Sequence, residues 1–211
     1  MNFELWNPIY QKILDDFKFD RKADDYAAKI LSDMIIKRDD LIDRAVFLDI
    51  VNGKDVIVCG NAPSLKDDIE RLDCANFVMI VADGATTVVL DSGIVPDIIV
   101  TDLDGDVKRE VLANKSGSVV VIHAHGNNID ALEKWVPLFN GILCTTQSKP
   151  FGSLHNFGGF TDGDRAVYIA YEFNAKNIKL AGFNFEDLDV TDMKKKKLKW
   201  AKYLIGRLDL K

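Results

Sequence analysis

Six short, continuous runs of apolar residues, most of them β-branched, recur along the chain after its first quarter. They cover residues 55–60, 77–84, 97–102, 118–126, 141–146 and 177–185. Runs of this length without polar alternation are typical of strands that are covered on both faces, with helical segments between them. The pattern predicts an α/β fold with a mainly parallel sheet and flanking helices.

The chain before this series has a different period. Between about residues 8 and 50, apolar residues such as Ile13 and Phe17 recur at helical spacing. We therefore expect an N-terminal helical subdomain over residues 1–52 and an α/β catalytic domain over residues 53–211. A subunit contact in a homo-oligomer is a hypothesis for the N-terminal segment, with no motif behind it.

Composition narrows the class of partner. The chain has 33 acids against 27 bases, a net charge of -6, which argues against a nucleic-acid surface but is compatible with a nucleotide held through a divalent metal. Its three cysteines are widely spaced and form no CxxC motif, so neither a disulfide framework nor a structural zinc site is indicated. Since no run approaches the ~18 apolar residues of a membrane span, we expect a cytoplasmic protein without a membrane partner.

Polar residues gather where the predicted strands end. In open parallel sheets the ligand crevice lies outside the carboxyl ends of the strands, so these segments are expected to meet at one site. The stretch PDIIVTDLDGD places Asp102 and Asp104 at such an end. Carboxylates crowded in this way favour a magnesium-nucleotide site, and the alternative is an acidic surface turn.

Two further strand ends have the composition of nucleotide-binding turns. In GNAPSL, the backbone around Gly60, Asn61 and Ser64 is a candidate for receiving phosphate, whereas a turn capped by a box of Ser64 and Asp67 is the structural alternative. The segment is neither a P-loop nor a GxGxxG fingerprint. In ADGAT, Asp83 and Gly84 are candidates for binding a ribose hydroxyl or, for Asp83, a metal, although an Asp before a Gly is also ordinary turn chemistry.

The segment HAHGNN is a candidate for reading a polar heterocycle or a phosphate. It brings His123 and His125 to one side of an extended stretch, followed by the amides of Asn127 and Asn128. Hydrogen bonding is favoured over zinc binding, since no third nitrogen or sulfur ligand has a matching spacing.

The segment TDGDRA opens a predicted helix. Thr161 or Asp162 could cap that helix, while Asp164 and Arg165 could reach a metal or a phosphate. The lysine tract 194–197 lies beyond the last strand and is interpreted as the solvated face of a C-terminal helix rather than a phosphate site.

In their order, GNAPSL, VADGAT, GIVPDIIVTDLDGD, HAHGNN, GGFTDGDRA and IKLAGFNF resemble the archaeal 6-hydroxymethyl-7,8-dihydropterin pyrophosphokinases. That family is distantly similar to thiamine pyrophosphokinases, which carry ADGGAN and PD(x)₃GDFDS at the corresponding places. The resemblance covers roughly residues 55–186 and implies a thiamine pyrophosphokinase-like catalytic domain. It further implies Mg²⁺-dependent transfer of pyrophosphate from ATP to the CH₂OH of a reduced pterin in a folate-type or methanopterin-type pathway, with release of AMP.

The resemblance also implies roles for individual residues. Asp102 and Asp104 match the two metal-binding acids of GDFDS, and Asp83 matches the acid of ADGG. The thiamine enzymes carry a third motif, TDFTKA. Its counterpart in this chain is either TDGDRA or HAHGNNIDAL, and the resemblance leaves both candidates open. Two departures, Ala85 for the second Gly of ADGG and Gly105 for the Ser of GDFDS, weaken thiamine as the acceptor.

Phosphoryl-type transfer depends on alignment and charge neutralisation. Arg165 is a candidate for stabilising charge at the β-phosphate, and a carboxylate or His125 for accepting the proton of the alcohol. The alternatives are a thiamine pyrophosphokinase, a sugar-nucleotide transferase, because Asp102-Leu103-Asp104 satisfies a DxD motif, and a non-catalytic nucleotide-binding module.

Overall fold

A computed structural model describes residues 1–72 and 74–210, and within them seven strands form one sheet. The strands are β1 (Asp55–Cys59), β2 (Val78–Ala82), β3 (Ile98–Thr101), β4 (Val119–Ala124), β5 (Ile142–Thr146), β6 (Leu154–His155) and β7 (Asn177–Ala181). The α-helices are α1 (Phe3–Phe17), α2 (Arg21–Ile35), α3 (Arg44–Val51), α4 (Leu65–Arg71), α5 (Thr86–Asp91), α6 (Val107–Lys115), α7 (Ile129–Trp135), α8 (Asp162–Glu172) and α9 (Asp192–Ile205).

The sheet is parallel throughout, with the order β6-β5-β4-β3-β2-β1-β7. Each of the six predicted apolar runs contains a strand, so the predicted α/β class is confirmed. The short strand β6 was not predicted, because two paired residues leave no periodicity in the sequence. Strand β7 returns to pair with β1 at the other side of the sheet.

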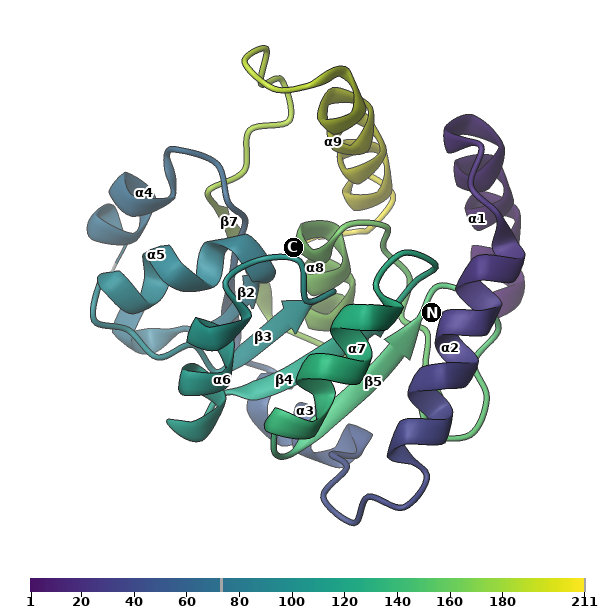
Figure 1. Cartoon of the computed structure of the whole chain (residues 1–211). Helices are drawn as coiled ribbons and strands as arrows, with labels where there is room; N and C mark the ends of the chain where they lie inside the picture. The colour runs from purple at the N-terminus through teal and green to yellow at the C-terminus, as the bar shows by residue number, and fades with distance from the viewer. Residues whose placement is uncertain (73, 211) are drawn as a thin grey trace.

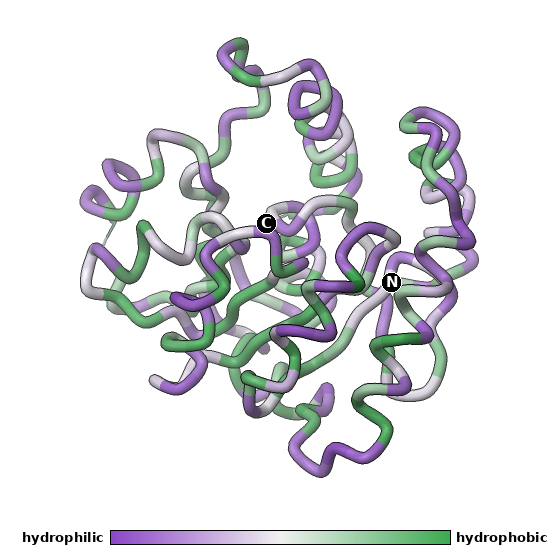
Figure 2. The backbone as a smooth tube through the Cα atoms, in the orientation of Figure 1, coloured by the Kyte–Doolittle hydropathy of each residue, from purple (hydrophilic) through white to green (hydrophobic). Residues whose placement is uncertain are grey.

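Both faces of the sheet are covered, as continuous apolar strands require. In β3, Ile98 and Val100 pack in a cluster with residues of α3 and α8, whereas Ile99 packs on the opposite face with residues of α2, α6 and α7. Figure 2 shows that hydrophobic residues are concentrated in the strands, whereas hydrophobic and hydrophilic residues alternate along the helices.

The N-terminal helices pack against the rest of the chain. Helix α2 buries Ala27, Leu31 and Ile35 in the same cluster as strands β3 to β5, and α1 shares a cluster with residues of α8 and α9. The division of the chain at residue 52 stays a prediction. Among the helices of the described residues, none is both long and apolar enough to cross a membrane.

Because the strands are parallel, their carboxyl ends lie at one edge of the sheet. Helices α9 and α1 project beyond the sheet on the side towards which the arrows of β3 and β5 point (Figure 1). The polar segments that follow the strands therefore lie beneath α9 and beside the N-terminal helices.

Candidate active site

Three acids from different segments meet at the carboxyl edge of the sheet. Asp83 follows β2, Asp102 follows β3 and Asp162 begins α8, and one carboxylate oxygen of each lies within 4.8 Å of the others. The predicted metal set of Asp83, Asp102 and Asp104 shares two members with this cluster. Asp104 lies beside this cluster, and the charges of Asp83 and Asp102 act on its carboxyl group.

The chain after β3 wraps around the carboxylate of Asp83. Oδ2 of Asp83 accepts hydrogen bonds from Thr101 Oγ1 (3.1 Å) and from the backbone N–H groups of Asp104 (3.2 Å) and Gly105 (3.0 Å). The turn is possible because Leu103 adopts a left-handed conformation with φ 68°. A Cβ at Gly105 would lie 1.7 Å from Asp83 Oδ1, so the turn requires glycine.

Two oxygens of the cluster are buried without an N–H or hydroxyl donor. Within the described part of the chain, neither Asp83 Oδ1 nor Asp102 Oδ1 accepts from an N–H group or a hydroxyl group, and other carboxyl groups, Glu110 for Asp83 and Asp104 for Asp102, are their neighbours. Asp102 Oδ2 accepts from His125 Nε2 at 3.0 Å. Burying an unpaired carboxylate oxygen is costly unless a cation offsets it. This donor set therefore fits a hard divalent cation, which prefers carboxylate oxygens.

Burial and the proximity of other charged groups shift the pKa values of the acids at this site. Burial, and then the charge of Asp102, raises the pKa of Asp83. Burial opposes ionisation of Asp102 as well, but the hydrogen bond and charge of His125, with the charge of Arg165, outweigh it and lower its pKa. Burial and the charges of Asp102 and Asp83 raise the pKa of Asp104 to about 6.

Behind Asp83 lies a further buried acid. Glu110 of α6 is fully buried, and its carboxyl group interacts with Asp83 and Thr101. Burial, followed by the charge of Asp83, raises its pKa to about 9. The raised pKa favours the protonated form of Glu110, which limits the negative charge beside the cluster.

Residues of the TDGDRA segment have two roles: some cap helix α8, and Asp162 belongs to the acidic cluster. Thr161 and Asp164 form a capping box at the start of α8, where Asp164 accepts from the backbone N–H groups of Phe160 (2.6 Å) and Thr161 (2.8 Å). Arg165 donates to Asp162 Oδ1 (2.6 Å) and to the carbonyl of Phe160 (3.1 Å). Asp164 is therefore occupied by the cap, and Arg165 orients the acid that joins the cluster.

The HAHGNN segment supports the cluster from β4. Asn128 donates to the carbonyls of Asp102 and His123, both at 2.8 Å, and accepts from the N–H of His125, which fixes the loop. His123 is buried against Thr145 (Nδ1 to Oγ1 3.0 Å), and burial lowers its pKa, so it is a neutral residue of the interior. Asn127 is exposed at the edge of a cavity.

Two cavities flank the acids. The first chamber, of about 280 Å³, is bounded by the turns after β1, β2 and β7, the start of α8 and the facing side of α9. The second chamber, of about 390 Å³, is bounded by the start of α2, the turns after β4 and β5, and residues of α8 and α9. Asp104 and Lys197 line both chambers, so the two cavities meet beside the cluster.

The predicted residues of the strand ends are distributed around these chambers. Gly60, Asn61 and Gly84 line the first chamber with Asp83. Ser64 does not line this chamber, and its hydroxyl donates to Asp68 Oδ2 at 3.0 Å. The predicted capping box of Ser64 and Asp67 is wrong: the Ser64 side chain caps no backbone N–H of α4.

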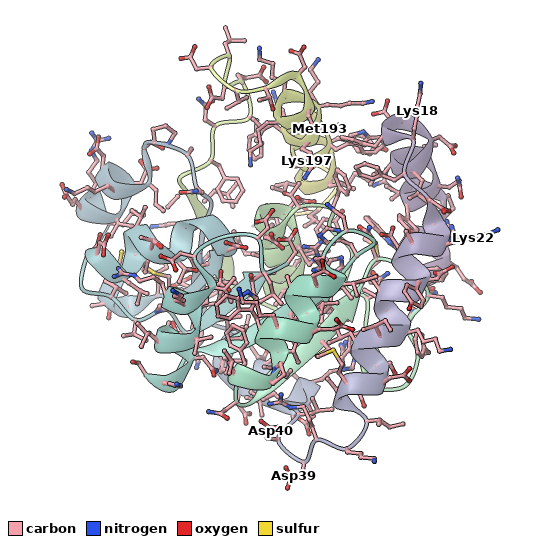
Figure 3. All side chains as sticks on the ribbon, viewed as in Figure 1. Lys18, Lys22, Asp39, Asp40, Met193 and Lys197 are labelled. Carbon is pink, nitrogen blue, oxygen red and sulfur yellow. The ribbon has the colours of Figure 1, made fainter. Side chains whose placement is uncertain are left out.

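The lysine tract lies on a C-terminal helix, as predicted, but only part of it is a solvated face. Lys195 pairs with Asp192 and Lys196 with Asp16, whereas Lys194 and Lys197 line the first chamber. Lys197, which is labelled in Figure 3, lies on α9. The helical repeat was visible in the sequence, but not the packing that places two of the lysines at the first chamber.

Two more residues of the site were missed. Asp24 of α2 and Gln147, which follows β5, both line the second chamber. The position of Gln147 directly after a predicted strand was a usable signal. Asp24 has no such signal, because it is one of several charged residues of an amphipathic helix.

A solved structure shares the fold. The structure titled "Structure of MAf glycosyltransferase from Magnetospirillum magneticum AMB-1" aligns with a TM-score of 0.51 and 15% sequence identity. The alignment covers 87% of this chain and 35% of that chain, so this chain spans about a third of its length. At this identity the likeness shows the fold alone.

Sequence comparison gives the family. Residues 35–190 match the family model described as 6-hydroxymethylpterin diphosphokinase MptE-like. A protein of Methanothermobacter thermautotrophicus named 6-hydroxymethyl-7,8-dihydropterin pyrophosphokinase is 47% identical over 89% of this chain and 81% of its own length. Proteins of the same name from Methanocaldococcus jannaschii and Pyrococcus furiosus are each 38% identical, over 99% and 97% of this chain and 96% and 93% of their own lengths. The chain therefore belongs to the 6-hydroxymethylpterin diphosphokinase MptE-like family.

Proposed function

We propose that this protein transfers the pyrophosphoryl group of ATP to the hydroxymethyl group of 6-hydroxymethyl-7,8-dihydropterin and releases AMP. The observation that carries the proposal is the meeting of two chambers at Asp104, beside a cluster of carboxylates with buried oxygens that accept from no N–H or hydroxyl group of the described residues. Two chambers suit two substrates that must react at their junction. The names of the relatives support the same chemistry.

Mg²⁺ is the cation that we assign to the cluster. Asp83, Asp102 and Asp162 would hold it, with Asp104 beside them. When bound, Mg²⁺ would neutralise charge on the phosphates of ATP and on the departing AMP. Arg165 keeps Asp162 in place, and His125 does the same for Asp102.

The first chamber is our assignment for ATP. Gly60, Gly84 and Gly163 bring backbone rather than side chains to its wall, which allows phosphates to approach closely. The N–H groups at the start of α8 face an anion favourably. Phe183 gives the same chamber a flat apolar surface that suits the adenine ring.

The second chamber is our assignment for the pterin. The oxygen of its hydroxymethyl group forms a bond to the β-phosphorus of ATP, while the bond from that phosphorus to the oxygen shared with the α-phosphate breaks. AMP leaves with the electron pair of the broken bond. Asp104 lines both chambers, so it is placed to accept the hydroxyl proton, and Lys197 adds positive charge at the same junction.

The product is an activated pterin of the kind consumed in tetrahydromethanopterin or folate-type synthesis, and we place the protein in such a pathway. The test is chromatographic: purified protein with ATP, Mg²⁺ and the pterin, beside a reaction with thiamine. AMP and pyrophosphorylated pterin are expected only in the first reaction, and EDTA should abolish both. If AMP formed only with thiamine, thiamine rather than the pterin would be the acceptor. If no AMP formed with either compound, the proposal would be refuted.

A further inference from the structure

A buried carboxylate forms part of the second chamber. Asp24 of α2 is 5% exposed and Gln147 is 6% exposed, and both line this cavity. Neither residue belongs to the acidic cluster, and Asp24 lies before residue 35, where the match to the family model begins. The question is why the cavity contains a carboxylate on this side.

The carboxylate is held rigidly. Its Oδ1 accepts from the N–H of Gly126 (2.7 Å), and its Oδ2 accepts from the Tyr10 hydroxyl (2.5 Å) and from Gln147 Nε2 (2.8 Å). A Cβ at Gly126 would lie 2.6 Å from Cβ of Ala23, so helix α2 packs directly on this loop. Asp24 therefore cannot turn towards solvent without breaking three hydrogen bonds.

The same arrangement leaves acceptor capacity on the wall of the cavity. A carboxylate has about four acceptor positions, and three donors occupy Asp24. The side-chain Nε2 of Gln147 donates to Asp24, and no described residue donates to its side-chain Oε1. Two acceptors side by side suit a ligand that presents two adjacent N–H donors.

We propose that Asp24, with Gln147, reads the donor edge of the acceptor's heterocycle and so determines specificity in the second chamber. The proposal rests on the proposed function, in which a reduced pterin occupies this chamber. A pterin presents its exocyclic 2-amino group beside a ring N–H, which matches a carboxylate and an amide oxygen. Phe19 and Phe160 line the same cavity and give the flat ring an apolar surface.

The other candidates for this role are engaged elsewhere. Neither Asn128 nor Asp164 lines the second chamber: Asn128 is bonded to the loop after β4, and Asp164 to the cap of α8. Asp162 belongs to the acidic cluster. Asn127 lines the second chamber, but it is exposed and lacks the fixed geometry of Asp24.

The decisive variant is Asp24→Asn, with Asp25→Asn as its matched control. Asp25 is the next residue of the same helix and is exposed, so the control makes the same change of charge outside the chamber. Losing a hydrogen bond to a charged group predicts a KM for the pterin about 10- to 100-fold higher in Asp24→Asn. The KM for ATP should stay within about twofold of wild type, and the control should match wild type in both.

A purely structural role predicts a different result. If the network only fastens α2 to the sheet, Asp24→Asn should lower the unfolding midpoint and raise the two KM values together. That outcome, or an unchanged KM for the pterin in a stable variant, would overturn the proposal.

A second measurement needs no variant. The analogue with a 2-oxo group in place of the 2-amino group presents an acceptor to the Asp24 carboxylate, so wild type should bind it at least about 100-fold more weakly than the pterin. Binding is measured by fluorescence titration without ATP, so the result stands even if no AMP is formed and the proposed transfer fails. Equal binding of the two compounds would contradict the assignment of Asp24.

Discussion

Replacing Gly105 with alanine tests the geometry of the acidic turn directly. The new Cβ would lie 1.7 Å from Oδ1 and 2.8 Å from Cγ of Asp83. Asp83 is 4% exposed, and its other oxygen accepts three hydrogen bonds, so the carboxylate has no free direction in which to move. Either the turn opens or Asp83 leaves its position.

The magnitude follows from the bonds that must break. Separating the Cβ and Oδ1 to ordinary contact needs a displacement of more than about 1 Å, which is enough to break the hydrogen bonds from the N–H groups of Asp104 and Gly105. Two hydrogen bonds to a carboxylate at about 1.5 kcal/mol each give a loss of about 3 kcal/mol in the free energy of unfolding. Because the same change moves a ligand of the proposed metal site, pyrophosphoryl transfer should also fall sharply.

Urea unfolding of four proteins measures the effect: wild type, Gly105→Ala, Asp83→Ala and the double variant. If the clash is the cause, Gly105→Ala should lower the free energy of unfolding by less than about 0.5 kcal/mol in the protein that already carries Asp83→Ala. The coupling free energy between the two changes should then exceed about 2 kcal/mol. Additive costs, or a loss below about 1 kcal/mol in Gly105→Ala alone, would refute this account of the turn.

Three further predictions concern charge. Asp102→Asn should lower AMP formation by at least about 100-fold while the far-ultraviolet circular dichroism stays that of wild type, and near-normal turnover would remove this acid from the mechanism. Lys197→Ala should lower kcat, whereas Lys195→Ala, which removes only the ion pair with Asp192, should leave it unchanged; equal kcat values in the two variants would exclude a role at the junction. Asp40→Asn should lower the free energy of unfolding by at most about 1 kcal/mol at pH 7, because the Asp40 side chain is 38% exposed and water screens its pair with Arg38. The hydrogen bond from Arg38 lowers the pKa of Asp40 from 3.8 to about 2, so its contribution is present above the unfolded pKa and should disappear in urea titrations as the pH falls from 4 to 2.

The fold could be predicted because its signal is local. Each apolar run that gave a strand is continuous and β-branched, and parallel pairing follows from the helical segments between the runs. Strand β6 escaped prediction because pairing with β5 alone defines its two residues. The capping box expected at Ser64 failed because the hydroxyl meets Asp68 instead of a backbone N–H, a choice between two nearby partners that spacing does not resolve.

The sequence by itself determined the parallel sheet and the place of Asp83 and Asp102 at one edge of it. Each of these acids directly follows an apolar run in the sequence, and parallel strands have their carboxyl ends at the same edge of the sheet. Only the tertiary structure decided that Asp24 and Lys197 join that edge. Asp24 meets Gln147 across 123 positions of the chain, and it does so because α2 buries its apolar face on β4 and β5. An amphipathic pattern specifies that a helix must cover some apolar surface, but it does not name the surface, so the polar residues at the border of that contact are placed by packing alone.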